Sequence, residues 1–370
     1  MPVLLRAAIW NVMTEIGSGA SDPRDLLNMT SLLSWQDKLT LLRKVVGIAD
    51  LAIPTPTGLP HGTHALRVFL APEYLFSETC NRHVVNYETR GHLVEGLKTL
   101  SADFPDLLLI PGTVSYFKPL VDNKLEKARL KADPTHIART VKYQGLYTVG
   151  AEKKTYLAHN TAYAFYGGQQ VFKYRKMLNC GELNTQDSKA AKVMIFAVGN
   201  QLGTFDFNQI GTTVKIGLEI CADHDDGQLR KGGAANLDLQ LVLAASTAMK
   251  KTNAVLRTGG VLLHCNAGDT STDGNRRAWQ NVAGTLTDIR TMGGGAPPGP
   301  ERIDPTARPE LSSLSNKTAK FDRAFEKVQT KVVVKAMGKG PNTTNYVQQK
   351  VTAYAQTRGG TVHFYEATIP

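Results

Sequence analysis

Three chemically active side chains each follow directly on an apolar, strand-like run of the sequence. Cys221 ends the run 214–220, in which apolar residues alternate with polar or small ones. Glu73 comes just after the run 66–70, and Lys176 comes just after a third run. A thiol, a carboxyl group and an ammonium group can serve as nucleophile, general base and oxyanion stabiliser. Together they are the parts that cysteine-based acyl transfer needs.

Each of these residues also has an ordinary structural interpretation when it is taken alone. Cys221 could be a buried thiol that packs as a small apolar group. Glu73 could cap a helix or lie at a rim, and Lys176 could be a solvated strand end. Their joint occurrence at three strand ends favours the chemical interpretation. A carboxyl group in an apolar stretch is also well suited to act as a base near neutral pH.

Apolar periodicity predicts the elements that must position these residues. Helical spacing predicts helices over 36–53 and 86–103, and the pair Gly167-Gly168 between two strand-like runs predicts a hairpin. Strands are predicted at 3–12, 66–70, 106–115, 160–166, 169–174, 193–198, 203–207, 214–220, 237–245 and 260–265. Helices separate the early strands, and the later strands follow in a run. This order favours an α/β fold with a mixed sheet or a sandwich of sheets with outer helices.

Two stretches differ from this pattern. Residues 117–154 are charged and weakly periodic, which predicts a basic surface insertion, and residues 268–315 are rich in Gly, Pro, Thr and Asp, which predicts loop. Weaker patterns predict a short helix at 25–33, a short helix or loop at 226–236, a helix at 319–336 leading into a strand at 332–334, and edge strands within 345–368. We therefore expect a main domain over 1–268 and a loop-rich extension over 269–370 that packs on the same domain.

The bulk properties argue against several classes of protein. The chain has 370 residues, of which 42% are hydrophobic, so it can bury a sizeable core and is not a disordered chain. Its four cysteines are widely spaced without a CxxC pair, which argues against a zinc ribbon and favours free thiols in a reducing compartment. The formal net charge is +11, but Lys and Arg are diffuse and not interleaved with aromatic residues, so no nucleic-acid partner is predicted.

The sequence also carries no sign of a membrane or secretory segment. No run approaches the ~20 apolar residues of a membrane span, and the first ten residues predict a strand and not a leader. We therefore expect a cytoplasmic protein without a membrane partner. Export by a route that needs no N-terminal signal stays open.

Three short motifs occur in a fixed order along the chain. They are Ala71-Pro72-Glu73, then Asn160-Thr161-Ala162 together with the segment 174–178, then Gly217-Leu218-Glu219-Ile220-Cys221. In these motifs the sequence resembles the nitrilase superfamily of carbon–nitrogen hydrolases, over roughly residues 3–268. The resemblance implies a nitrilase-like α-β-β-α sandwich, in which two mixed sheets pack together between outer helices. The insertion and the C-terminal extension would be additions to this core.

The resemblance also implies a reaction and a role for each residue. Cys221 would be the nucleophile, Glu73 the general base, and Lys176 the holder of the oxyanion together with the backbone N–H of Ala222. Glu182 matches a second glutamate that assists proton transfer in the family. The implied activity is that of an amidase acting on a small molecule through an acyl-thioester, without metal or organic cofactor. Nitrile hydrolysis, acyl transfer to an amine, and a catalytically idle binding module stay open as alternatives, and a homo-oligomer is expected from the resemblance alone.

The turn after Cys221 departs from the family pattern, so it is where we expect substrate choice to be determined. Ala222, Asp223 and His224 are the substrate-binding candidates. Asp223 could instead be a solvated turn residue, and His224 could be a core histidine. His264 and Cys265 are adjacent, but no further ligand lies near them in the sequence, so no metal site is predicted.

Overall fold

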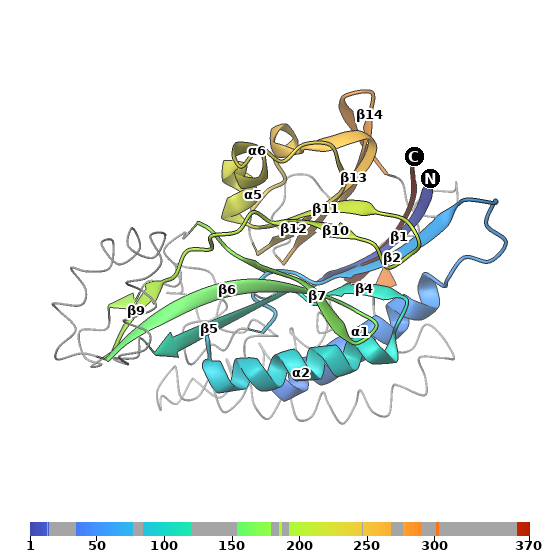
Figure 1. Cartoon of the computed structure of the whole chain (residues 1–370). Coiled ribbons are helices and arrows are strands. Elements are labelled where there is room, and N and C mark those ends of the chain that lie inside the picture. The colour runs from blue at the N-terminus through green and yellow to red at the C-terminus, as the bar shows by residue number, and fades with distance from the viewer. Residues whose placement is uncertain are drawn as a thin grey trace, which may run out of the picture.

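Two β-sheets and a small number of helices make up a mixed α/β fold (Figure 1). The computed structural model describes residues 1–12, 14, 35–76, 84–119, 154–178, 185–186, 192–245, 247–267, 277–289, 301–302 and 361–370. None of the helices in these ranges is both long and apolar enough to cross a membrane.

The first sheet has eleven strands and carries both chain termini. Its main path runs β16-β17-β1-β2-β4-β6-β5-β3. In addition, β7 and β9 pair with β6, and β8 pairs with β9. The strands are β1 (Val3–Asn11), β2 (His64–Leu70), β3 (Val85–Asn86), β4 (Leu107–Ile110), β5 (Thr113–Pro119), β6 (Lys154–Tyr166), β7 (Gln169–Arg175), β8 (Thr185–Gln186), β9 (Lys192–Phe196), β16 (Glu301–Arg302) and β17 (Thr361–Ile369). β1, β2 and β4 are parallel, whereas β17 pairs antiparallel with β1 and β7 pairs antiparallel with β6.

The second sheet has six strands in the order β10-β11-β12-β13-β14-β15. They are β10 (Thr204–Phe207), β11 (Val214–Ile220), β12 (Leu237–Ala244), β13 (Leu256–Asn266), β14 (Ala278–Val282) and β15 (Thr285–Asp288). The three central strands β11, β12 and β13 are parallel. Every residue of β12 is buried, as expected for a parallel strand that is covered on both faces.

One apolar core joins the two sheets. It contains Leu66, Val68 and Leu70 of β2 together with Ile216 and Leu218 of β11, all at 0% exposure. In both strands these are alternate residues, so one face of each strand points toward the other sheet. The carboxyl ends of β2 and β11, where Glu73 and Cys221 follow, are therefore fixed by burial on the same core.

The helices cover the outer sides of the sheets. α1 (Trp35–Ala52) and α2 (Tyr87–Asp103) lie along the outer face of the first sheet, where their apolar stripes join a second core with Phe69 and Tyr163 (Figure 1). The side chain of Asn86 caps α2 by accepting from the N–H of Thr89 at 2.7 Å. The short helices α5 (Ala222–Asp226), α6 (Gln228–Lys231) and η3 (Lys251–Asn253) belong to the second sheet's side.

Most of the predicted strands and both long helices are confirmed within the described residues. The strand predicted over 106–115 is wrong in one respect, because it is divided into β4 and β5 by Gly112 with a φ of 80°. A Cβ at Gly112 would lie 2.3 Å from the carbonyl oxygen of Pro72, so this glycine lets the segment before Glu73 pack closely. An apolar run shows burial but does not show where a glycine bends it.

The region beyond residue 268 contributes to both sheets. The loop prediction for 268–315 did not anticipate β14, β15 and β16, whereas β17 overlaps the edge strands predicted within 345–368. β14 and β15 form a hairpin that extends the second sheet, and β17 lies between β1 and β16 within the first. Tyr365 and Ile369 of β17 are part of the core between the sheets. The helices predicted at 25–33 and 319–336, the strand at 332–334, and most of the insertion 117–154 lie outside the described residues.

Candidate active site

Glu73, Lys176 and Cys221 each follow the last residues of a strand, and the fold brings the three side chains together between the two sheets. Glu73 comes three residues after β2, Lys176 directly after β7, and Cys221 directly after β11. The first two strands belong to one sheet and the third to the other. The site therefore exists only because the two sheets pack face to face.

Glu73 and Lys176 form a buried ion pair. Lys176 Nζ lies 2.8 Å from Glu73 Oε1, and the two side chains are 1% and 0% exposed. Asn160 Nδ2 donates a second hydrogen bond to the same carboxylate oxygen at 2.7 Å. The Lys176 N–H donates to the Asn160 carbonyl at 2.9 Å, so one residue of β6 positions both members of the pair. Because buried charges are costly unless paired and hydrogen-bonded, these contacts are what stabilise a charged carboxylate in this buried position.

The backbone around Glu73 is also held in place. The Thr14 hydroxyl donates to the Glu73 carbonyl, and the Tyr74 N–H donates to Thr113 Oγ1 at 2.9 Å. Tyr74 has a φ of 61°, which is uncommon for a non-glycine residue. The ring of Tyr74 lies 5.8 Å from Lys176 Nζ. The turn after β2 is thus a rigid support that points the carboxyl group toward the lysine.

Cys221 sits on a strained turn. Its φ of 49° and ψ of −107° lie in a sparsely populated region of backbone space, which costs on the order of 1–3 kcal/mol. Its N–H donates to the Leu243 carbonyl at 2.8 Å, and its carbonyl accepts from the N–H groups of His224 and Asp225 at 2.9 and 3.1 Å. These bonds hold the residue between the end of β11 and the start of α5. The strain is therefore maintained by the surrounding structure, as is usual at functional turns.

The Cys221 thiol is protonated in this environment. Burial raises its pKa well above the usual range, and the negative charge and hydrogen bond of Glu73 raise it further. The nearby charge of Lys176 and a hydrogen bond with Thr247 act in the opposite direction and are outweighed. The thiol is thus a neutral S–H next to a carboxylate that can accept its proton.

Thr247 was not identified from the sequence, and Asn160 was not counted among the catalytic residues. Cys221 Sγ and Thr247 Oγ1 are 2.7 Å apart, and either atom can be the donor. Thr247 follows β12, the parallel neighbour of β11, and carboxyl ends of adjacent parallel strands meet at one edge. The sequence could have indicated Thr247, because this residue follows the strand predicted over 237–245. The contact between Asn160 and Glu73 joins residues 87 positions apart, and no local pattern indicates it.

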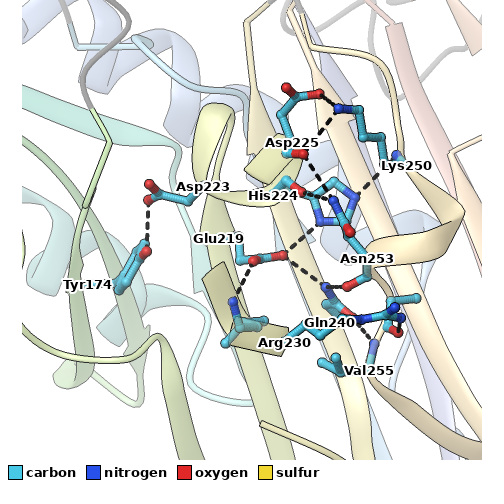
Figure 2. A network of polar contacts seen from close by, with 12 residues as sticks. Tyr174, Glu219, Asp223, His224, Asp225, Arg230, Gln240, Lys250, Asn253 and Val255 are labelled. Atoms are coloured by element: carbon cyan, nitrogen blue, oxygen red, sulfur yellow. Dashed lines mark hydrogen bonds and ion pairs between the residues drawn. The ribbon is translucent and has the colours of Figure 1, made fainter. Parts of the chain in front are cut away.

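Asp223, two residues after Cys221, contacts the segment around Lys176, and its bond to Tyr174 is drawn in Figure 2. Its carboxylate accepts from Tyr174 Oη at 2.7 Å and from the N–H groups of Met177 and Leu178 at 3.1 and 2.8 Å. The side chain is fully buried, and burial raises the pKa of Asp223 to about 7, although these hydrogen bonds act to lower it. Asp223 thus connects the residues on both sides of Lys176 to α5, the helix that begins directly after Cys221.

His224 belongs to a network of polar contacts that includes Glu219, Gln240 and Lys250 (Figure 2). Its Nδ1 lies 2.7 Å from Glu219 Oε2, and its Nε2 accepts from the Lys250 N–H at 3.3 Å. The Glu219 carboxylate also accepts from Gln240 Nε2 at 2.9 Å and from the Leu229 N–H at 3.0 Å. The substrate-binding roles predicted for Asp223 and His224 stay predictions, and these protein contacts do not favour them.

Glu182, the predicted second glutamate, lies outside the described residues. Two of the four cysteines, Cys80 and Cys180, also lie outside them. Cys265 is a buried free thiol on β13. Across the described ranges, no group of three or more His, Cys, Asp or Glu side chains could hold a metal ion.

Comparison with known proteins gives little guidance. No protein-family model and no curated protein sequence matches the chain. Among solved structures it is similar to the glutamine-dependent NAD+ synthetase from Acinetobacter baumannii in complex with adenosine diphosphate, with a TM-score of 0.35 and 11% identity over 71% of this chain and 38% of that one. A glutamine-dependent NAD(+) synthetase from Cytophaga hutchinsonii gives a TM-score of 0.35 and 14% identity over 78% of this chain and 40% of that one.

The chain therefore spans about two fifths of the length of these synthetases. TM-scores of this size support no conclusion about fold or activity. The chain resembles the nitrilase superfamily in its three motifs, and its function is inferred below from its own geometry.

Proposed function

We propose that the protein is an amidase-type hydrolase of non-peptide carbon–nitrogen bonds with a nitrilase-like α-β-β-α sandwich. The observation that carries this proposal is the buried Glu73–Lys176 pair beside a thiol on a strained turn. A buried ion pair alone is common in protein cores. A nucleophile, a base and a cation that converge from three strand ends are the arrangement that acyl transfer requires.

The first half of the reaction is acylation of Cys221. As the sulfur attacks the amide carbonyl carbon, the S–H proton moves to the Glu73 carboxylate, so no free thiolate has to accumulate. The tetrahedral oxyanion is stabilised by the Lys176 ammonium and by the N–H of Ala222. That N–H is the first of α5, and first-turn N–H groups have no acceptor within their own helix. The C–N bond then breaks, the protonated Glu73 gives its proton to the leaving amine, and a thioester remains.

The second half is hydrolysis of the thioester. Glu73 accepts a proton from water as the water oxygen attacks the acyl carbon, and the C–S bond breaks. The proton returns to sulfur, which restores the neutral thiol and releases a carboxylic acid. Thr247 lies 2.7 Å from the sulfur; its hydroxyl accepts from the S–H before attack and donates to the sulfur as the C–S bond breaks. The contact of Glu73 with Lys176 and the contact of Cys221 with Thr247 support these steps.

Two enzymatic alternatives use the same residues. A nitrile carbon can replace the amide carbonyl, and an amine can replace water in the second half. A catalytically idle binding module is a third alternative. It is disfavoured because Glu73, Lys176 and Cys221 are all present and adjacent.

The test is a search for a covalent adduct. The protein is incubated with a pool of small amides and nitriles, and intact-mass and peptide analysis locate any acyl group. We expect an adduct on Cys221 that is absent from Cys221→Ala and retained in Cys265→Ala, the matched control for a buried thiol. A trial amine that captures the acyl group would indicate transfer. Turnover that survives in Cys221→Ala would refute the mechanism, and ligand-dependent thermal stabilisation without adduct or product would favour a binding module.

A further inference from the structure

A cluster of cations lies on the outer face of the first sheet, near the start of α2. We call Arg90 of α2, Lys118 of β5, and Lys173 and Arg175 of β7 the basic cluster. The strand register places Lys173 opposite Tyr163 and Arg175 opposite Thr161, which fixes these side chains on one face. Lys176 has the opposite parity and points to the other face. The basic cluster is therefore separate from the candidate active site, although the two share β7.

The cations gather around tyrosine rings. The Arg90 guanidinium carbon lies 5.5 Å from the ring centroids of both Tyr116 and Tyr163, and Arg90 Nε donates to Tyr163 Oη at 2.9 Å. Lys173 Nζ lies 5.8 Å from the Tyr163 ring, and Lys118 Nζ lies 5.9 Å from the Tyr87 ring. The rings provide cation–π contacts but no compensating negative charge.

Two charges of this cluster, those of Lys173 and Arg175, are not balanced by a carboxylate within the part of the chain that the structure describes. Two exposed lysines elsewhere do have carboxylate partners, Lys250 with Asp225 at 2.7 Å and Lys231 with Asp226 at 2.5 Å. No carboxylate of the described residues forms an ion pair with Lys173 or Arg175. Burial lowers the pKa of Lys173 to about 8, and the charges of Arg175 and Arg90 lower it further. Like charges held together in this way are stabilised by a bound anion.

Buried polar atoms without partners lie on the same face. Thr161 is fully buried and its Oγ1 has no hydrogen-bond partner among the described residues, and the same holds for Arg175 Nε. His159 is 7% exposed, and its Nδ1 also lacks a partner there. Tyr116 lies opposite His159 in the β5–β6 register, which places His159 on this face as well. Buried polar groups are normally satisfied, so three in one place indicate a missing partner.

We propose that the basic cluster and Thr161 form a binding site for a phosphate group. A phosphate offers several acceptor oxygens and up to two negative charges, which match two or more cations and hydroxyl and guanidinium donors. The site is built from α2, β5, β6 and β7, so it is a feature of the folded sheet and not of one segment. The phosphate group can be free inorganic phosphate or part of a small phosphomonoester.

Titration calorimetry at low ionic strength and pH 7 tests the proposal with two probes, inorganic phosphate and glycerol phosphate. We expect saturable binding of one equivalent to the wild-type protein. Lys173→Met should weaken it about tenfold or more, and Thr161→Val, which leaves the net charge unchanged, should weaken it several-fold. Lys98→Met is the matched control, because Lys98 is an exposed lysine of α2 that pairs with Glu95 at 2.8 Å, and binding should be unchanged.

The outcomes separate the sources and decide the proposal. Equal affinity for both probes indicates a site for the phosphate group alone, and tighter binding of glycerol phosphate indicates a phosphomonoester ligand. Either result supports the site. Absence of saturable binding of both probes would overturn it. Equal weakening in Lys98→Met and Lys173→Met would also overturn it, since that would show attraction by net charge alone. Should Lys173→Met fail to fold, the Thr161→Val comparison with the control still decides.

Discussion

The buried Glu73–Lys176 pair predicts a large coupling free energy between two single substitutions. Lys176→Met removes the ammonium group and leaves the carboxylate in a place where both side chains are at most 1% exposed. Breaking a buried pair on one side typically costs about 3–5 kcal/mol of unfolding free energy. The hydrogen bond from Asn160 Nδ2 persists and offsets part of this loss, so we expect about 3 kcal/mol.

The double variant provides the decisive comparison. Glu73→Gln alone leaves the Lys176 ammonium buried without its counter-charge and should cost a similar amount. In Glu73→Gln/Lys176→Met neither charge of the pair remains, and replacing both partners of a buried pair is often close to neutral. The double variant should therefore be more stable than the sum of the single effects predicts, with an interaction free energy of about 2–4 kcal/mol.

Urea unfolding followed by circular dichroism measures these free energies at pH 7. A matched cycle on the exposed pair Lys98 and Glu95 serves as control and should give at most about 0.5 kcal/mol. The reasoning would be refuted if the effects of the two buried substitutions were additive. It would equally be refuted if Lys176→Met were as stable as the wild type.

Three further predictions concern single groups. Iodoacetamide should alkylate Cys221 before Cys265, because Cys221 is 7% exposed and Cys265 is fully buried. Glu73→Gln should slow alkylation of Cys221 about tenfold or more, because burial raises the pKa of the thiol and keeps it protonated, and the variant lacks the carboxylate that accepts its proton. Equal alkylation rates for the two thiols, measured by mass spectrometry, would contradict this. Burial, and after it the charges of His224 and Arg277, lower the pKa of His264 to about 3. Between about pH 6.5 and about pH 3 the unfolded chain therefore binds one proton more than the folded chain, and the free energy of unfolding should fall as pH falls, by up to about 1.4 kcal/mol per pH unit. Urea unfolding of His264→Gln should show a flatter dependence on pH. Burial raises the pKa of Asp223 to about 7, so between about pH 4 and about pH 7 the folded chain holds one proton more than the unfolded chain. The free energy of unfolding should therefore fall as pH rises over this range. Asp223→Asn should lose this decline, and a decline that persists in the variant would show that Asp223 is not its cause.

Local physics explains why much of the fold could be predicted from the sequence. Alternating apolar residues mark strands, and helical spacing marks α1 and α2, because each pattern directly reports which side of an element is buried. The same patterns located Glu73, Lys176 and Cys221 at strand ends. They failed where one residue changes the path, as at Gly112, and where strands with little apolar content are held by a neighbour, as in the hairpin of β14 and β15.

The sequence alone determined which side chains could do chemistry and that each follows a strand. Only the tertiary structure decided how they meet. Strand pairing within the first sheet brings Glu73 and Lys176, 103 positions apart, to a 2.8 Å contact. Packing of the second sheet on the first through one apolar core brings Cys221 beside them. The same packing assigns Asp223 and His224 to contacts that support the turn at Cys221, and it places Thr247 beside the sulfur. Local patterns record burial and backbone preference, whereas the partner of a buried polar group is set by packing between distant segments.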